Sequence, residues 1–353
     1  MLLKLNKLYF LYKKNIFILN LFFLINFIQL KGQETKWHNL LQNNNLNEFV
    51  QLNGKANFTL KNGVLIGTSK LNTPNSFLAT KTKYSNFILE FDVLIDNDLN
   101  SGVQFRSESL KNYLDGRVHG YQCEIETSSR KWAGGIYDEA RRGWLYPLSR
   151  NKTGQEAFIR GSWNKYRIEA IGNSIKTFVN SVEVSNLFDD MTQEGFIAFQ
   201  VHGISNPEQE GKQVRWKNIR ILVTDLERNR MIALNKAPHI SYLDGTLTQE
   251  EKRLGFRMLW DGKTTNGWRG AKMMIFPKKG WEIKDGILTV QASGGKESRN
   301  GGDIVTTESF RNFELSVDFL LSPGANSGIK YLVKTNLNKG EGSSIGLEFQ
   351  ILD

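Results

Sequence analysis

Hydrophobic and polar residues alternate with a period of two along several short segments of the chain. Tyr121, Cys123 and Ile125 are each separated by a glutamine or a glutamate, and residues 102–106 and 196–202 alternate in a similar way. Neighbouring side chains of a strand point to opposite faces of a sheet. These segments are therefore predicted to be strands with one apolar face in a core and one polar face outside it. Cys123 is predicted to lie in the core and not to act as a nucleophile.

Turn residues separate the apolar runs. Asn62-Gly63 and Asp285-Gly286 lie between hydrophobic segments, and both turn positions tolerate positive φ, which is typical of a tight β-hairpin. Long helical patterns are scarce. Many strands of this length over about 190 residues indicate an all-β fold, either a two-sheet sandwich or a jelly roll.

The chain also contains an internal repeat. The matching segments are NFILEFDV (86–93) with NFELSVDF (312–319), NSGVQF (100–105) with NSGIKY (326–331), and GYQCEIE (120–126) with GLEFQIL (346–352). Each pair is separated by 226 residues, which predicts two homologous domains and not a short-period solenoid. Asp353 aligns with Thr127, so the second copy is predicted to be incomplete. Either the chain continues beyond this sequence, or a partner completes the sandwich.

These patterns divide the chain into four parts. Residues 1–32 are predicted to be a signal peptide, 33–224 a first β-sandwich, 225–255 a linker with a short helix, and 256–353 a second, truncated domain. Within the linker, Thr248 and Glu251 have the spacing of a capping box, and Gly255 provides a stop signal.

The first 32 residues combine five lysines and no acidic residue with the apolar run IFILNLFFLINFIQL. This composition predicts a cleaved secretory signal, although the length of the run leaves an uncleaved anchor open. A chain with one cysteine cannot form an intramolecular disulfide. We therefore expect a bacterial periplasmic or secreted protein that is not held at the membrane after cleavage. Without those five lysines the net charge falls from +10 to +5 with both signs interspersed, so no nucleic-acid partner is expected.

The polar faces of the predicted strands collect side chains that bear chemistry. The members of this set are Gln104, Arg106, Gln122, Glu124, Glu126, Gln200 and His202. A polar sheet face is often only solvated. The following loop favours a carbohydrate site, because Trp132, Tyr137 and Trp144 are costly to expose and their ring faces suit sugar C–H groups. The segment DEARRGW (138–144) alternatively fits a salt-bridged turn.

Longer motifs resemble a known family. The chain contains NSGVQFRS, HGYQCEIETSSRKWAGGIYDEARRGWLYP, and GFIAFQVHG followed by VRWKNIRI; its second half contains LTQEEKRLGFRMLWDGKTTNGWRG, NSGIKY and LEFQILD. Together these stretches resemble the 3-keto-disaccharide hydrolase domain, also described as the 3-keto-α-glucoside-1,2-lyase/3-keto-2-hydroxy-glucal hydratase domain, over residues 37–223 and 256–353. The resemblance implies a concanavalin-like jelly-roll sandwich that acts on 3-keto-glycosides.

The implied reaction assigns roles to the polar side chains. A 3-ketone acidifies the C2 proton, so elimination of the C1 oxygen needs a base, a stabiliser of enolate charge and an acid. Glu124 is the expected base, Arg106 and His202 the expected oxyanion stabilisers, and Tyr137 or Asp138 the expected acid. The further residues expected to bind substrate are Gln104, Gln122, Glu126, Trp132, Arg141, Trp144 and Gln200. No nicotinamide cofactor is expected, because a separate sugar 3-oxidoreductase would supply the ketone.

The second copy departs from this pattern. Glu348 and Gln350 exchange the acid and the amide of Gln122 and Glu124. Leu332 stands where the first copy has Arg106, whereas Asn326 retains the asparagine of the Asn-Ser-Gly motif. At most one copy is therefore expected to use the catalytic set described above.

Two other functions remain open at this stage. A retaining glycosidase needs two carboxylates about 5 Å apart, which Glu124 and Glu126 could supply. A glycan-binding module would use the same polar face without catalysis. The metal requirement is unknown, because Glu124, Glu126 and His202 could together bind a divalent cation. No phosphate-binding glycine loop and no HExxH motif is present in the sequence.

Overall fold

The computed structural model describes residues 36–42, 45–292, 294, 300–336 and 345–353. The predicted signal peptide lies outside the described residues. The chain divides into two compact units, Met1–Ile240 and Ser241–Asp353. Within the described part of the chain, no helix is both long enough and apolar enough to span a bilayer.

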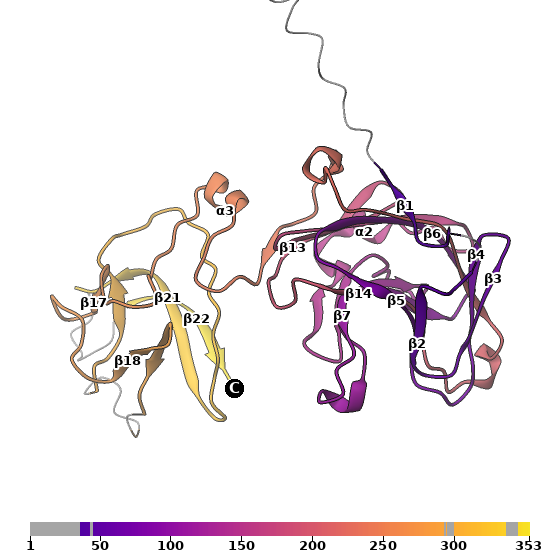
Figure 1. Ribbon diagram of the computed structural model, residues 1–353. Coiled ribbons are helices and arrows are strands. Elements are labelled where there is room, and N and C mark those ends of the chain that lie inside the picture. The colour runs from indigo at the N-terminus through magenta and orange to yellow at the C-terminus, as the bar shows by residue number, and fades with distance from the viewer. Residues whose placement is uncertain (1–35, 43–44, 293, 295–299, 337–344) are drawn as a thin grey trace, which may run out of the picture. The chain divides into compact units, whose positions relative to one another are not determined.

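The first unit is a jelly-roll β-sandwich of two antiparallel sheets (Figure 1). The nine-stranded sheet follows the order β16 (Ile240–Ser241), β13 (Val182–Phe188), β12 (Ser174–Val179), β11 (Asn164–Ile171), β6 (Phe87–Ile95), β15 (Gln213–Leu222), β4 (Val64–Thr68) and β3 (Asn57–Lys61), with β1 (His38–Asn39) beside β15. The seven-stranded sheet follows the order β10 (Gly143–Tyr146), β9 (Ile136–Glu139), β8 (His119–Glu126), β7 (Asn100–Glu108), β14 (Gly195–Val201), β5 (Ser76–Tyr84) and β2 (Phe49–Asn53). The short helices of this unit are η2 (Leu114–Gly116), η3 (Leu148–Arg150), α2 (Lys152–Gln155), η4 (Pro207–Gln209) and η5 (Glu227–Asn229). The all-β sandwich expected from the sequence is thus confirmed.

The core lies between the two sheets, and the alternation along the strands determines which side chains enter it. Tyr121, Cys123 and Ile125 are fully buried in one apolar cluster, which Val103 and Phe199 also join. Cys123 is an unbridged, buried thiol. Burial of such side chains removes about 25 cal/mol of unfavourable hydration per Å² of apolar surface. The polar residues between them consequently project from the opposite face of the seven-stranded sheet.

The segment predicted to be a linker is partly integrated into the first unit. The Met231 backbone N–H donates to Glu169 Oε1 at 2.8 Å, and the Tyr146 hydroxyl donates to the Pro238 carbonyl at 2.7 Å. Strand β16 pairs with β13 and closes one edge of the nine-stranded sheet. Residues 225–240 therefore pack against the sandwich through hydrogen bonds, one of them to the buried carboxylate of Glu169, and through strand pairing at a sheet edge. The polar sequence of this segment does not reveal these contacts.

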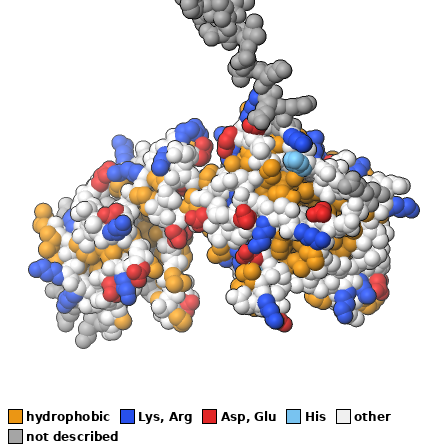
Figure 2. All heavy atoms as spheres, in the orientation of Figure 1, with side chains coloured by type: hydrophobic (Ala, Val, Ile, Leu, Met, Phe, Trp, Pro, Cys, Tyr) orange, Lys and Arg blue, Asp and Glu red, His pale blue; other side chains and the backbone are white. Residues whose placement is uncertain are grey.

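The second unit is also rich in strands. Its elements are α3 (Gln249–Leu254), β17 (Trp268–Gly270), β18 (Trp281–Lys284), β19 (Ile287–Val290), β20 (Ile304–Thr306), β21 (Asn326–Lys334) and β22 (Ile345–Leu352). The strands form three pairs, β17–β20, β18–β19 and β21–β22. The predicted capping box of Thr248 and Glu251 is present at α3, and Gly255 caps the helix in the left-handed conformation. On the face of the molecule shown in Figure 2, charged side chains of both signs are interspersed.

Two hairpins of the second unit reproduce hairpins of the first. In β21–β22 Gly328 is opposite Gln350, and in β7–β8 Gly102 is opposite Glu124. The remaining residue pairs of the two hairpins also match at an offset of 226 residues, and so does the position of the register shift. Because register is fixed by side-chain pattern and turn geometry, this agreement supports the predicted tandem repeat.

The backbone conformations of the two copies agree as well. Arg106 and Leu332, which are 226 residues apart, adopt φ of 45° and 53° at the register shift. Asn62 and Asp285 both adopt φ of 51° in the turns between β3 and β4 and between β18 and β19. Positive φ is uncommon outside glycine, so its occurrence at matching positions is further support for the repeat.

Candidate functional site

The candidate site lies on the polar face of the seven-stranded sheet. Gly102 is opposite Glu124, and Gln104 is opposite Gln122 across β7 and β8. On the other side of β8, Gln122 is opposite Tyr137 of β9. Residues paired in this way share a face of the sheet. Gly102, Gln104, Gln122, Glu124 and Tyr137 therefore form one continuous surface. We call this surface the site face.

A chain of hydrogen bonds orders the side chains of the site face. Ser107 Oγ donates to Gln104 Oε1 at 2.8 Å, and Gln104 Nε2 donates to Gln122 Oε1 at 2.7 Å. Gln122 Nε2 in turn donates to Glu124 Oε2 at 2.9 Å. A Cβ atom at Gly102 would lie 2.4 Å from Gln122 Cδ, so the amide can cross this position only because it is glycine. The network therefore ends on the carboxylate of Glu124.

Glu124 is almost fully buried, and its environment suits a base that works near neutral pH. Burial raises the pKa of Glu124 to about 7, and neighbouring Glu126 acts in the same direction. Hydrogen bonds from Asn100 and Gln122 and the charge of Arg130 oppose this rise in pKa. Asn100 Nδ2 donates to Glu124 Oε1 at 2.6 Å. A carboxylate with such a pKa is ionised in a large fraction of molecules at pH 7 and still accepts a proton readily.

Arg130 covers the same carboxylate and was not identified from the sequence. Its Nη2 lies 3.2 Å from Glu124 Oε1, and its Nε lies 3.1 Å from Glu126 Oε2. The guanidinium carbon lies 5.0 Å from the ring centroid of Trp132 and 4.9 Å from that of Trp144. Two clues in the sequence were available, namely the four-residue spacing from Glu126 and the neighbouring tryptophan.

Aromatic side chains form a cluster beside Glu124. The rings of Trp132 and Trp144 lie 4.8 Å apart, and the rings of Tyr137 and Trp144 lie 5.2 Å apart. Burial raises the pKa of Tyr137, and the nearby carboxylates of Glu139 and Glu124 add to this effect. The Tyr137 hydroxyl is therefore protonated at neutral pH. Trp132 and Trp144 therefore cluster with Tyr137 of the site face, and their binding of a carbohydrate stays a prediction.

Glu126 has a different environment from Glu124. Its Oε1 accepts from the Trp132 backbone N–H at 2.6 Å. Its Oε2 accepts from Arg130 and from the Ser128 hydroxyl. Both oxygens therefore have partners within the protein, and the carboxylate acts to hold the loop and the guanidinium.

The predicted role of Arg106 as an oxyanion stabiliser is wrong. Its fully buried guanidinium donates to the carbonyls of Ser85 and Gly172 at 2.7 and 2.8 Å, and to Asn86 Oδ1 at 3.2 Å. These acceptors belong to the turns between β5 and β6 and between β11 and β12. Arg106 also lies four positions along β7 from Gly102, or about 13 Å at the rise of a strand. The register shift at Arg106 redirects the side chain away from Glu124.

The predicted role of Asp138 as an acid is also wrong, and Arg141 is not on the site face. Asp138 is opposite Tyr121, which places it on the core side of the sheet. It accepts hydrogen bonds from Arg141 at 2.7 Å and from Arg142 at 2.6 Å. Asp189 binds Arg142 and the Tyr121 hydroxyl in the same buried network. The segment is the salt-bridged turn that the sequence left open, because Asp138 alternates with Tyr137 along β9.

Gln200 of β14 and His202, which follows this strand, make no contact with Glu124 among the described hydrogen bonds and ion pairs. His202 follows the strand, is exposed, and its Nδ1 lies 2.7 Å from the Gly203 carbonyl oxygen. Among the described residues, no hydrogen bond or ion pair joins His202 to Glu124. Gln200 is fully buried, and neither atom of its side-chain amide has a partner in the described part of the chain.

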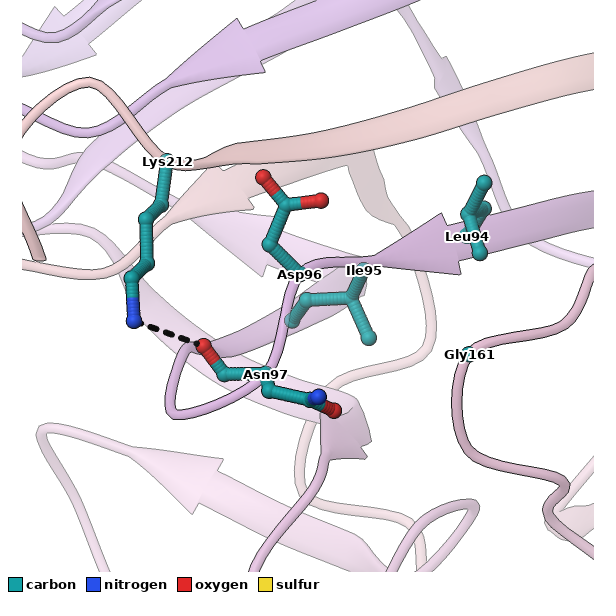
Figure 3. A pocket seen from close by; sticks show the side chains of 6 residues that line it. All are labelled: Leu94, Ile95, Asp96, Asn97, Gly161 and Lys212. Carbon is teal, nitrogen blue, oxygen red and sulfur yellow. Dashed lines mark hydrogen bonds between the residues drawn. The ribbon is translucent and has the colours of Figure 1, made fainter.

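A second feature of the first unit is a shallow hollow away from the site face. It is lined by Leu94, Ile95, Asp96, Asn97, Gly161 and Lys212 (Figure 3). Lys212 Nζ donates to the Asn97 carbonyl across it at 3.2 Å. In the described residues, no group of three His, Cys, Asp or Glu side chains is placed to hold a metal ion. The divalent cation that the sequence left open is not tested by this arrangement.

The second copy retains the geometry of the site hairpin without its carboxylate. Gln350 Nε2 donates to Asn326 Oδ1 at 2.5 Å, whereas in the first copy Asn100 donates to Glu124. Glu348 lies at the position of Gln122, and a Cβ at Gly328 would lie 2.1 Å from its Oε1. The hydrogen-bond direction is therefore reversed, and the amide at position 350 cannot accept a proton from a substrate.

The chain is similar to several known proteins. A 3-keto-disaccharide hydrolase of Bacteroides thetaiotaomicron is 38% identical over 109 residues, which cover 28% of this chain and 37% of that protein. The chain thus spans little more than a third of the curated relative. Among solved structures, a carbohydrate-binding module from Bacillus subtilis is 16% identical, with a TM-score of 0.35 over 50% of this chain and 95% of the other. A Bacillus licheniformis β-glucanase is 10% identical, with a TM-score of 0.35 over 54% and 97%.

The family model of the 3-keto-alpha-glucoside-1,2-lyase-like domain matches residues 36–222 and 255–353. The two matched segments fall in the two domains predicted from the sequence and together cover most of the chain. The chain belongs to the 3-keto-alpha-glucoside-1,2-lyase-like domain family.

Proposed function

We propose that the site face of the first unit cleaves the glycosidic bond of 3-keto-glycosides by elimination, with Glu124 as the base. One observation carries this proposal: Glu124 is a buried carboxylate with a pKa of about 7, held by donors on the polar face of a sandwich of this family. Proton abstraction beside a ketone requires a base of this kind.

The reaction balances with the groups present. Glu124 removes the C2 proton, and the released electron pair forms a C2–C3 double bond as the C3 carbonyl becomes an enolate. When the enolate returns to the ketone, a C1–C2 double bond forms and the C1–O glycosidic bond breaks. Addition of water across C1–C2 then completes net hydrolysis. The C2 proton is acidic enough only because of the adjacent ketone.

Tyr137 is the proposed acid for the leaving oxygen. It shares the site face with Gln122 and keeps its proton at neutral pH because burial raises its pKa. Trp132 and Trp144 beside it offer ring surface for the apolar face of a sugar. Gln104 and Gln122 are bonded to each other and, through Gln122, to Glu124, so their proposed part is to hold the base in place.

The setting of the reaction is part of the proposal. The 3-keto group would come from a separate sugar 3-oxidoreductase, since the elimination itself needs no hydride carrier. Export to the periplasm or the medium rests on the composition of residues 1–32.

The decisive experiment compares a 3-keto-disaccharide with its unoxidised parent in deuterated water. We expect turnover of the keto-sugar only, with deuterium incorporated at C2. An ordinary glycosidase would hydrolyse the parent as well, and a glycan-binding module would turn over neither sugar.

The pH dependence of the reaction provides a further prediction. Only ionised Glu124 accepts the C2 proton, so kcat/KM should rise with pH and reach half its maximum near pH 7. Initial rates measured from about pH 5 to about pH 9 test this expectation. A half-maximum near the ordinary glutamate value of about 4.3 would contradict it.

A further inference from the structure

We infer that Arg130 is a catalytic residue. Its guanidinium stabilises the negative charge that develops on the enolate oxygen as Glu124 takes the C2 proton. This inference rests on the proposed elimination and assigns the electrophilic group that the elimination requires. Stabilisation of charge that develops in the transition state is commonly a large contribution to catalysis.

The first support is the position of the guanidinium. Arg130 Nη2 lies 3.2 Å from Oε1 of Glu124, the oxygen that also binds Asn100. In a 3-keto-sugar the enolate oxygen is borne by C3, the carbon next to the one that loses its proton. A substrate that places its C2 proton at Glu124 therefore places its C3 oxygen beside a cation that already touches the base.

The second support is that the guanidinium is fixed before any substrate arrives. Glu126 holds Nε at 3.1 Å, and the rings of Trp132 and Trp144 lie about equally far from the guanidinium carbon. Gln155 of α2 donates to the Arg130 carbonyl at 3.0 Å, which also restrains the backbone. Glu126, Trp132 and Trp144 are therefore positioning residues, and the site avoids reorganisation during the reaction.

The third support is unused hydrogen-bonding capacity. A guanidinium has five N–H donors, and among the described residues none accepts a hydrogen bond from Nη1 of Arg130. The side chain is 41% exposed, so part of it is accessible to a ligand. A guanidinium that served only to neutralise Glu124 and Glu126 would need no open edge.

The charges also change in the required sense. Before the reaction, Arg130 faces the negative charge of Glu124. Once the C2 proton has moved, Glu124 is neutral and the negative charge lies on the C3 oxygen of the substrate. The same cation can therefore interact with the charge before and after transfer, without leaving its place between the tryptophan rings.

The test uses the full chain with Arg130→Ala, Arg130→Lys and, as a matched control, Lys131→Ala. Lys131 is the next residue and pairs only with exposed Glu156 among the described residues. We expect Arg130→Ala to lower kcat about 10²–10³-fold with little change in KM, which is the usual cost of losing an oxyanion donor. Arg130→Lys should recover part of this loss, added guanidinium should restore activity to Arg130→Ala, and Lys131→Ala should stay within about twofold of wild type.

A second readout separates a catalytic role from a structural one. Without Arg130 the pKa of Glu124 should rise, so the ascending limb of the pH profile should move to higher pH. A folded Arg130→Ala variant with wild-type kcat, or one that guanidinium does not rescue, would overturn the inference while leaving the elimination intact. A wild-type chain inert toward 3-keto-disaccharides, with no C2 exchange, would overturn both.

Discussion

Glu124→Gln should lower kcat for a 3-keto-disaccharide by about 10²–10⁴-fold, the usual contribution of a general base. Glutamine preserves the size of the side chain and can still bond with Asn100 and Gln122, so the dissociation constant of the substrate should change little. It cannot accept the C2 proton. Single-turnover rates and equilibrium binding, measured on the same preparation, separate these two quantities.

The second copy should not compensate for this loss. Gln350 occupies the position of Glu124 in β22, and an amide is already bonded there to Asn326. If a Glu124→Gln variant kept its activity and lost it only when Glu348 was also replaced, the base would lie in the second hairpin. The matched control is Glu183→Gln, because Glu183 is another buried carboxylate with a raised pKa but lies on β13 of the opposite sheet. That variant should keep its kcat within about threefold, the scale of an indirect effect.

Deuterium exchange provides the check that is independent of bond cleavage. Wild-type protein should exchange the C2 hydrogen of the keto-sugar with solvent, and Glu124→Gln should not. If the C2 hydrogen exchanged at the wild-type rate in the variant, Glu124 would not be the base.

The strands and their two faces could be predicted from the sequence because period-two alternation is a local property. The core positions Tyr121 and Cys123 and the site positions Gln122 and Glu124 all lie on the expected sides of β8. The tandem repeat stays a prediction, which the matching register of the hairpins β7–β8 and β21–β22 supports.

The errors arose where local alternation is interrupted or was not applied. At Arg106 a register shift with positive φ redirects the side chain, and nothing in the residues around it marks the shift. Asp138 lies in the short strand β9, where alternation places its side chain on the other face of the sheet from that of Tyr137. For Arg130 the sequence offers only the spacing from Glu126 and the nearby Trp132. Its contact with Trp144 becomes apparent only once the hairpin β9–β10 brings Trp144 beside Trp132.

Arg106→Leu should destabilise the first unit by about 2–4 kcal/mol, the cost expected when several buried acceptors lose their donor. The variant would leave the carbonyls of Ser85 and Gly172 and the side chain of Asn86 without the guanidinium. Leucine at this backbone conformation is itself acceptable, because Leu332 adopts nearly the same φ in the second hairpin. The loss should therefore come from the missing hydrogen bonds and not from backbone strain.

Urea unfolding followed by tryptophan fluorescence measures this loss, with Arg160→Leu as a control at an exposed arginine. The control should leave the unfolding midpoint unchanged. At a temperature where the variant is folded, Arg106→Leu should keep kcat within about threefold of wild type, because its side chain serves two turns on the far side of a register shift from Glu124. A variant with the wild-type midpoint and a hundredfold lower kcat would return Arg106 to the active site. Arg130 should show the opposite pattern, because its replacement should lower the rate much more than the stability. Its guanidinium is partly exposed and is bonded mainly to the carboxylates of Glu124 and Glu126.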